Sequence, residues 1–132
     1  MKRWIWLDAA DVTAYHAVQI AEHGGDAGLR DHGLLESALA RPRNLAAYGE
    51  PIAFDLAAAY AFGIAKNHPF VDGNKRAAFV ACVTFLELNG WQFVATEEEA
   101  AITFLGLADG NLTEQAVSRW LEANSRKIIR KR

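Results

Sequence analysis

Apolar and polar positions along the chain predict helices separated by turns that contain glycine or proline. Asp8 is a candidate N-cap with Asp11 in the first turn behind it, and the segment that follows reaches Gly24-Gly25. This pattern predicts a helix that runs to about His23. The residues before it, 3–7, are aromatic and β-branched and are compatible with one short strand.

The next part of the chain is polar and less regular. The segment GDAGLRDHG predicts a loop, and LLESALA predicts a short helix. We expect this helix to end at Arg41-Pro42, because proline disfavours the helical conformation of the residue before it. The stretch RNLAAYGEPIAF then contains turn residues without a clear period, and a loop and a small hairpin are both compatible with it.

The most hydrophobic region predicts two buried helices on either side of a polar interruption. The first extends from about Phe54 to Asn67 and is rich in alanine. Pro69 prevents this helix from continuing. The second begins near Asn74 and ends at LNG, where Gly90 is suited to a left-handed closing residue.

The C-terminal third predicts one extended segment and two capped helices. WQFV alternates and is compatible with a strand. Thr96 precedes three glutamates that match the dipole of a helix start, and Asp109-Gly110 ends that helix. Thr113 caps a last helix. The whole pattern predicts an all-α protein with one domain over residues 1–132.

Composition and charge narrow the functional class. The net charge of -2 gives no reason to expect direct nucleic-acid binding. Cys82 is the only cysteine, so the chain has no intrachain disulfide. The chain contains no apolar run of the ~20 residues that a membrane span needs. The apolar segment near its N-terminus is too short for a secretory signal. We expect a cytoplasmic protein, with residues 125–132 as a frayed basic tail.

The polar interruption, NHPFVDGNKRAAF, has the groups of a phosphate site. Gly73 lets the backbone approach a ligand closely, and the following residues, Asn74 and Lys75, place unpaired N–H groups at the start of a helix. Lys75 and Arg76 add two positive charges at the same corner. The spacing therefore predicts that residues 73–76 bind phosphate.

Two further side chains extend this site to chemistry. Asp72 beside a phosphate fits a Mg²⁺ ligand, since Mg²⁺ prefers one or two carboxylates plus phosphate oxygens and water. His68 can accept a proton from an attacking hydroxyl, and Phe70 between them is a candidate hydrophobic anchor. A lone histidine or an Asp-Gly-Asn turn is usually structural, but the combination favours attack of a hydroxyl on a nucleotide phosphate.

The string HPFVDGNKR resembles the signature of the Fic/Doc superfamily, H-x-F-x-[D/E]-[G/A]-N-[G/K]-R. Lys75 matches the death-on-curing (Doc) branch, whereas the adenylyl-transferring Fic branch usually has glycine there. GGDAGLRDHGLLESALARP, LAAAYAFGIAKNHPFVDGNKRAA and FLELNG also look like the Doc pattern, so the resemblance covers most of the chain.

The resemblance implies an all-α Fic fold with the active-site loop between two central helices and a possible small β flap. It implies that His68 is the general base, Phe70 the anchor and Asp72 the Mg²⁺ ligand, with the phosphate bound by the residues that follow, Gly73, Asn74, Lys75 and Arg76. For a Doc-like toxin it implies ATP- and Mg²⁺-dependent transfer of the γ-phosphate to a serine or threonine hydroxyl of elongation factor Tu. Two alternatives stay open: AMP transfer, and a catalytically idle repressor module.

The resemblance also raises expectations about regulation. Residues 44–54 fall where the superfamily has a flap that pairs with a target peptide. The string SRWLEA, which contains Glu122, departs from the family's inhibitory helix pattern by ending in alanine. We therefore expect inhibition by a separate antitoxin that supplies its own helix. The remaining histidines, His16, His23 and His32, have no spacing that builds a metal site.

Overall fold

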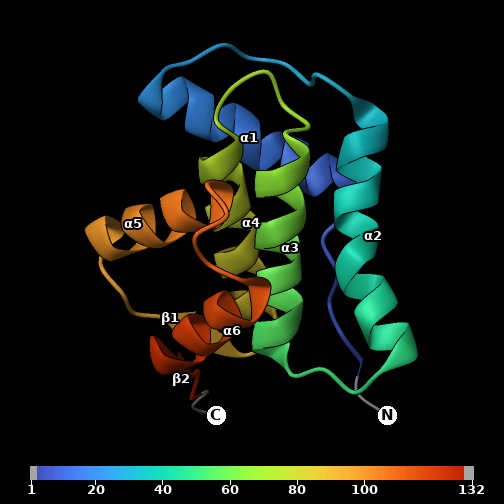
Figure 1. Cartoon of the computed structure of the whole chain (residues 1–132), viewed down its shortest axis with the longest axis vertical. Helices are drawn as coiled ribbons and strands as arrows, with labels where there is room; N and C mark the ends of the chain where they lie inside the picture. Colours follow the sequence, from blue (N-terminus) through green and yellow to red (C-terminus); the bar gives the residue numbers. More distant parts are fainter. Residues whose placement is uncertain (1–2, 130–132) are drawn as a thin grey trace.

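The computed structural model describes residues 3–129, and helices dominate it (Figure 1). The elements in chain order are α1 (Ala9–His23), α2 (His32–Tyr48), α3 (Ala53–Asn67), α4 (Asn74–Leu88), β1 (Trp91–Phe93), α5 (Glu97–Ala108), α6 (Glu114–Ala123) and β2 (Ser125–Lys127). The predicted all-α class is confirmed. The predicted helix starts at Asp8, Thr96 and Thr113 are also confirmed, because each of these side chains accepts a backbone N–H of the first turn.

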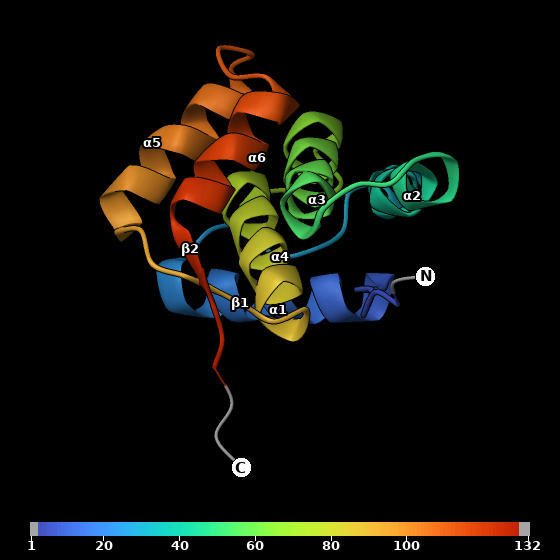
Figure 2. The same cartoon turned by 90° about the horizontal axis from the view of Figure 1, so that it is seen from below.

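Helices α3 and α4 form the centre of the molecule. α2 packs against α3 on one side, α5 and α6 lie on the other side of the pair, and α1 crosses near α4 (Figures 1 and 2). The alanine-rich sequence of α3 allows this close packing, and most of its residues are buried. Cys82 of α4 is fully buried, and burial raises the pKa of its thiol.

Helix α2 is longer than the sequence pattern predicts, because it continues through Pro42 to Tyr48. Proline cannot donate to the carbonyl of Ala38, four residues earlier. A Cβ placed on Gly63 of α3 would lie only 3.0 Å from that carbonyl oxygen, so α3 packs directly against the freed group. The buried positions of α2, Leu35, Ala38, Leu39 and Pro42, form one continuous stripe. Tertiary packing therefore holds the helix across the proline.

The segment RNLAAYGEPIAF, with which a loop and a small hairpin were both compatible, is mainly helical. Residues 44–48 belong to α2, and residues 49–52 connect it to α3. The small two-stranded sheet of the described residues lies elsewhere and is formed by β1 and β2. A flap hairpin over residues 44–54 is therefore not present in this structure.

The strand expected over residues 3–7 does not form. This segment is extended, but its backbone groups bond to side chains instead of a neighbouring strand. Ile5 N–H donates to Asn89 Oδ1 at 2.9 Å, and Leu7 N–H donates to the Tyr60 hydroxyl at 2.9 Å. These bonds join the N-terminal segment to α3 and to the end of α4.

The expected frayed tail is ordered at its beginning. Residues 125–127 form β2, which pairs antiparallel with β1 in the register Trp91↔Lys127 and Phe93↔Ser125. The rest of the predicted basic tail, from residue 130 onward, lies outside the described residues. No described helix is both long and apolar enough to cross a membrane.

Candidate active site

The motif loop, residues 68–73, joins the end of α3 to the start of α4 at one end of the molecule (Figure 1). His68 closes α3 in the left-handed conformation, with φ 50° and ψ 56°, and donates its backbone N–H to Ile64. Among the residues of the described chain it is the only non-glycine with positive φ. Its side chain is exposed, so the imidazole is available to a substrate.

Phe70 anchors the motif loop, as the sequence predicts. Its side chain is 1% exposed and stacks on the imidazole of His16 in α1, with ring centroids 3.9 Å apart. His16 Nε2 also donates to the backbone oxygen of Asp72 at 2.7 Å. His16 is therefore a buried support of the motif loop, a role for which its spacing in the sequence carries no signal.

Asn74 has a structural role beside the expected phosphate contact. Its side-chain amide accepts from Phe70 N–H at 2.9 Å and donates to Phe70 O at 3.0 Å. Both sides of the amide are thus committed to the backbone of the motif loop. The amide nitrogen also lies 3.5 Å from His68 Nδ1, a contact too long to fix which ring nitrogen carries the proton.

Asp72 presents its carboxylate at the surface of the motif loop. Oδ1 accepts the N–H of Gly73 at 2.8 Å, and Oδ2 accepts the N–H of Asp26 at 3.3 Å. Within the described residues no group of three or more His, Cys, Asp or Glu side chains is placed to hold a metal ion. Asp72 is thus a single carboxylate with free lone pairs rather than part of a protein cage.

The start of α4 differs from the starts of α1, α2, α5 and α6, where an Asp or Thr side chain caps the first turn. Gly73 is its N-cap, with φ 75°, and no described side chain caps the helix. The N–H groups of the first turn are consequently open to an external acceptor, and the positive end of the helix dipole lies with them. Lys75 and Arg76 are both exposed at this turn. The structure thus brings the predicted groups of residues 68–76 together.

The brace loop, residues 24–31 between α1 and α2, packs along the motif loop. Arg30 N–H donates to Pro69 O at 2.7 Å, and Val71 N–H donates to Gly28 O at 3.1 Å. The Arg30 side chain reaches further, with Nε 2.8 Å from His68 O and Nη2 3.0 Å from Asn67 O. The sequence pattern indicates only a polar loop here, so this contact with the motif was missed.

A groove begins beside Lys75 and Arg76 and runs between α1, α4 and α5. Its volume is about 510 Å³. Apolar side chains from α4 and α5 line it, including Phe79, Val80, Ala101, Phe104 and Leu105, and charged or polar groups border it. The groove therefore joins the exposed start of α4 to an apolar surface formed by α4 and α5.

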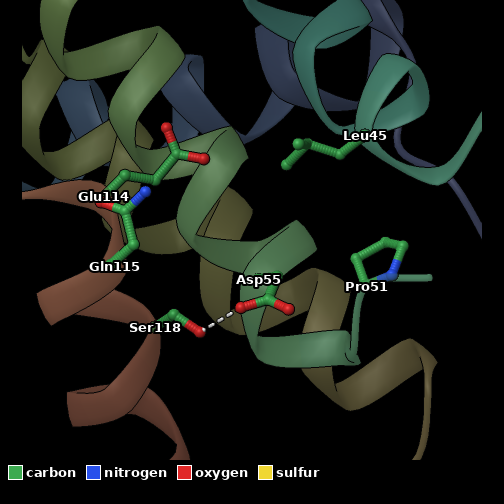
Figure 3. A pocket seen from close by; sticks show the side chains of 6 residues that line it. All are labelled: Leu45, Pro51, Asp55, Glu114, Gln115 and Ser118. Atoms are coloured by element: carbon green, nitrogen blue, oxygen red, sulfur yellow. Dashed lines mark hydrogen bonds between the residues drawn. The ribbon is translucent and has the colours of Figure 1, made fainter. Parts of the chain in front are cut away.

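A smaller pocket of about 140 Å³ lies near the opposite end of α3 (Figure 3). The Ser118 hydroxyl donates to Asp55 Oδ1 at 2.8 Å, and Glu114 in its wall is paired with Arg41. Ser118 and Asp55 thus bond to each other, and Glu114 bonds to a residue outside the pocket lining. The pocket contains none of the predicted site residues.

Comparison with known proteins agrees with this arrangement. Residues 6–86 match the model of the family described as "Fic/DOC family". The chain is 43% identical to "Toxin Doc" of Mycolicibacterium smegmatis over 93 residues, which cover 68% of each protein. It is 33% identical to "Protein kinase doc" of Escherichia phage P1 over 113 residues, which cover 85% of this chain and 89% of the relative. From the motif, the fold and these matches, the chain belongs to the Fic/DOC family and falls in its Doc branch.

Proposed function

We propose that this protein is a Doc-type toxin that transfers the γ-phosphate of ATP to a serine or threonine hydroxyl of a protein, with elongation factor Tu as the target. The observation that carries the proposal is the uncapped start of α4 beside the exposed side chains of His68 and Asp72. The relatives support it, since one is named a toxin and the other a protein kinase.

In this reaction His68 accepts the proton of the target hydroxyl as the oxygen attacks the γ-phosphorus. The bond between the γ-phosphorus and the bridging oxygen breaks, and ADP leaves. His68 Nδ1 lies 3.5 Å from the side-chain nitrogen of Asn74, so the exposed imidazole lies beside the start of α4.

The phosphates of ATP fit the start of α4. Its first-turn N–H groups, including those of Asn74 and Lys75, lack acceptors of their own, and an anion is favoured at the positive end of a helix. Lys75 and Arg76 supply compensating charge. Asn74 contributes through its backbone, because its side chain is committed to Phe70.

A Mg²⁺ ion fits Asp72 when it is shared with the nucleotide. The single carboxylate near the phosphate corner matches the preference of Mg²⁺ for one or two carboxylates, phosphate oxygens and water. Bound there, the ion would neutralise charge that develops on the phosphate oxygens. Asp72 would hold the ion, and the bonds that its carboxylate accepts from Gly73 N–H and Asp26 N–H orient it.

A labelling experiment tests the reaction. Purified elongation factor Tu is incubated with the protein, Mg²⁺ and ATP labelled either at the γ- or at the α-phosphate. We expect label from the γ position alone, and none with the His68→Ala variant. Label from the α position would identify AMP transfer instead. Growth arrest by His68→Ala equal to that of the wild type would show a binding module without catalysis.

The same proposal includes a neutralising antitoxin, because the name of one relative, "Toxin Doc", points to a toxin–antitoxin system. The groove beside Lys75 and Arg76 fits an amphipathic helix of such a partner, since its floor is apolar and its border is charged. The partner would cover the phosphate corner from there.

Substitutions on α5 test the groove. Leu105 lines it and is 47% exposed, whereas Ile102 on the same helix is 72% exposed and lies outside it. We expect Leu105→Arg to remain toxic but to escape neutralisation by the co-expressed antitoxin. Ile102→Arg should be neutralised like the wild type. Neutralisation of both variants alike would reject the groove as the docking surface.

A further inference from the structure

The brace loop takes no part in the proposed reaction, yet it contacts both residues on which that reaction depends. Arg30 bonds to His68 and to the residue before it, and Asp26 N–H bonds to the Asp72 carboxylate. We propose that the brace loop is the positioning element of the active site, with Arg30 as the positioning residue for His68. This inference rests on the proposed function.

His68 needs such support because of its backbone. A non-glycine residue with φ 50° is held in a sparsely populated conformation only when its surroundings determine it. Asn67 O and His68 O lie at the C-terminal end of α3, where carbonyl groups lack intrahelical donors. The Arg30 guanidinium satisfies both with one fork, and its positive charge matches this end of the helix dipole.

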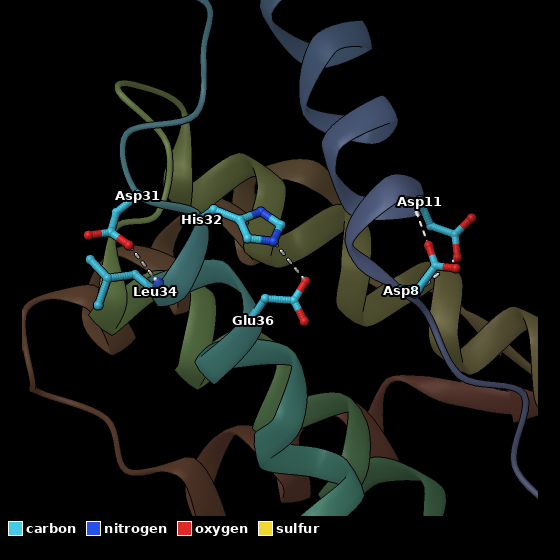
Figure 4. A network of polar contacts seen from close by, with 6 residues as sticks. All are labelled: Asp8, Asp11, Asp31, His32, Leu34 and Glu36. Carbon is cyan, nitrogen blue, oxygen red and sulfur yellow. Dashed lines mark hydrogen bonds and ion pairs between the residues drawn. The ribbon is translucent and has the colours of Figure 1, made fainter.

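The guanidinium does not act alone, because the backbone of the brace loop holds the same segment. Arg30 N–H and Asp31 N–H both donate to Pro69 O, at 2.7 and 3.0 Å. Asp31 in turn caps α2 by accepting the N–H of Leu34 at 2.9 Å (Figure 4). Arg30 therefore projects from a backbone held by hydrogen bonds just before the start of α2, which lets its side chain act as a rigid support rather than as a mobile surface group.

The second contact of the brace loop is with Asp72, and it depends on a glycine. A Cβ on Gly25 would lie 2.8 Å from Asp72 Oδ2, so any larger residue would displace the carboxylate. Gly24 provides a matched control. It also has positive φ, 81° against 117° for Gly25, but a Cβ there would meet nothing within 4 Å. Alanine at either position strains the backbone, and only alanine at Gly25 touches Asp72.

The first test compares Arg30→Ala and Arg30→Lys with Arg119→Ala, which removes one exposed charge from α6. Transfer of the γ-phosphate of ATP to elongation factor Tu gives kcat and KM, and thermal melting shows that each variant is folded. We expect Arg30→Ala to lower kcat at least tenfold and to leave KM for ATP within twofold. Arg30→Lys should fall between, because lysine has no fork, and Arg119→Ala should match the wild type.

A readout that does not need activity is the NMR spectrum of the His68 imidazole, assigned with His68→Ala. We expect its ring resonances to shift and broaden in Arg30→Ala and to stay unchanged in Arg119→Ala. If Arg30→Ala is unfolded, the same spectrum and kcat are taken from Arg30→Lys. An unchanged His68 spectrum and a kcat within twofold of the wild type would overturn the role of Arg30.

The second test compares Gly25→Ala with Gly24→Ala. We expect Gly25→Ala to require at least fivefold more Mg²⁺ for half-maximal transfer, and Gly24→Ala to keep the wild-type requirement. Without Mg²⁺ or nucleotide, the backbone amide NMR signal of Gly73, whose N–H donates to Asp72, should shift in Gly25→Ala and stay unchanged in Gly24→Ala. Equal Mg²⁺ requirements in the two variants would contradict the role of the brace loop in positioning Asp72. Activity of His68→Ala would instead refute the proposed function, whereas an inactive His68→Ala with full activity in Arg30→Ala and Gly25→Ala would refute this inference alone.

Discussion

The starts of α4 and α5 differ in what is available to accept the unpaired N–H groups of the first turn. At α5 the Thr96 hydroxyl accepts the N–H of Glu99 at 3.1 Å, and the glutamates of the first turn face the positive end of the helix dipole. At α4 the N-cap is Gly73, the first turn carries Lys75, and no side chain in the described chain takes the N–H groups. The first turn of α5 is satisfied by its own side chains, whereas the first turn of α4 leaves N–H groups open, as the proposed phosphate site requires.

This difference separates stability from function along one chain. A capped start contributes to folding by itself, whereas an uncapped start with positive residues contributes little until an anion binds. The cost at α4 is offset nearby, where the buried amide of Asn74 and the stacked rings of Phe70 and His16 hold the loop. Substitutions in the two regions should therefore give different combinations of activity and stability.

The largest effect is expected at the uncapped start, in Asp72→Ala. We expect transfer to elongation factor Tu to fall about 100-fold or more, equivalent to about 3 kcal/mol in the barrier, because the Mg²⁺ ligand is lost. The free energy of unfolding, measured with urea, should change by less than about 1 kcal/mol, since the carboxylate is exposed. An active variant would contradict the role of Asp72 as a Mg²⁺ ligand, and a strongly destabilised one would indicate a structural role instead.

Asn74→Ala is expected to lower the free energy of unfolding by about 2 to 3 kcal/mol, because it leaves the buried N–H and C=O of Phe70 without partners. Urea denaturation measures this loss. Asn111→Ala is the matched control, because Asn111 is exposed in the turn after α5 and its substitution should change stability little. Equal stability of the two variants would contradict the structural role of Asn74.

A smaller effect is expected at the capped start. Thr96→Ala should reduce the free energy of unfolding by about 1 kcal/mol, because one N–H of the first turn loses its acceptor. Phosphate transfer should remain at the wild-type rate. A loss of transfer in folded Thr96→Ala protein would mean that the two helix starts are not separate in function.

The smallest effect is expected in a phosphate titration that compares the starts of α4 and α5. Titration with inorganic phosphate should shift the backbone amide NMR signals of Asn74, Lys75 and Arg76, where the N–H groups are open. The signals of Glu97 and Glu99 in the first turn of α5 should not move, because that start is capped and negative. Equal shifts at both helices would show only a general effect of salt.

The sequence predicted local features well, because their causes are local. Each capping residue lies next to the helix that it starts, and Pro69 follows closely after the end of α3, the helix that it prevents from continuing. The prediction at Pro42 was wrong because the packing that holds α2 across the proline comes from another helix, at Gly63 of α3. The strand prediction for residues 3–7 was wrong for a similar reason, because the hydrogen-bond partners of this segment, Tyr60 and Asn89, are side chains far along the chain.

The same distinction applies to the candidate site. The groups of residues 68–76 are close in sequence, so their grouping could be predicted from spacing alone. The supports of the site could not, because His16 and Arg30 reach it from α1 and from the brace loop. The commitment of the Asn74 side chain was also hidden, since an asparagine at a helix start suits a ligand as well as its own backbone.

The long-range contacts that hold the motif loop affect the timing of folding. Arg30 and His68 are 38 positions apart, and His16 and Asp72 are 56 apart. Such contacts form only after the chain between them has been closed into a loop, which costs entropy before any bond repays it. We expect the site to be ordered only when α1 to α4 have docked, so that a chain synthesised only as far as α3 would lack an ordered site.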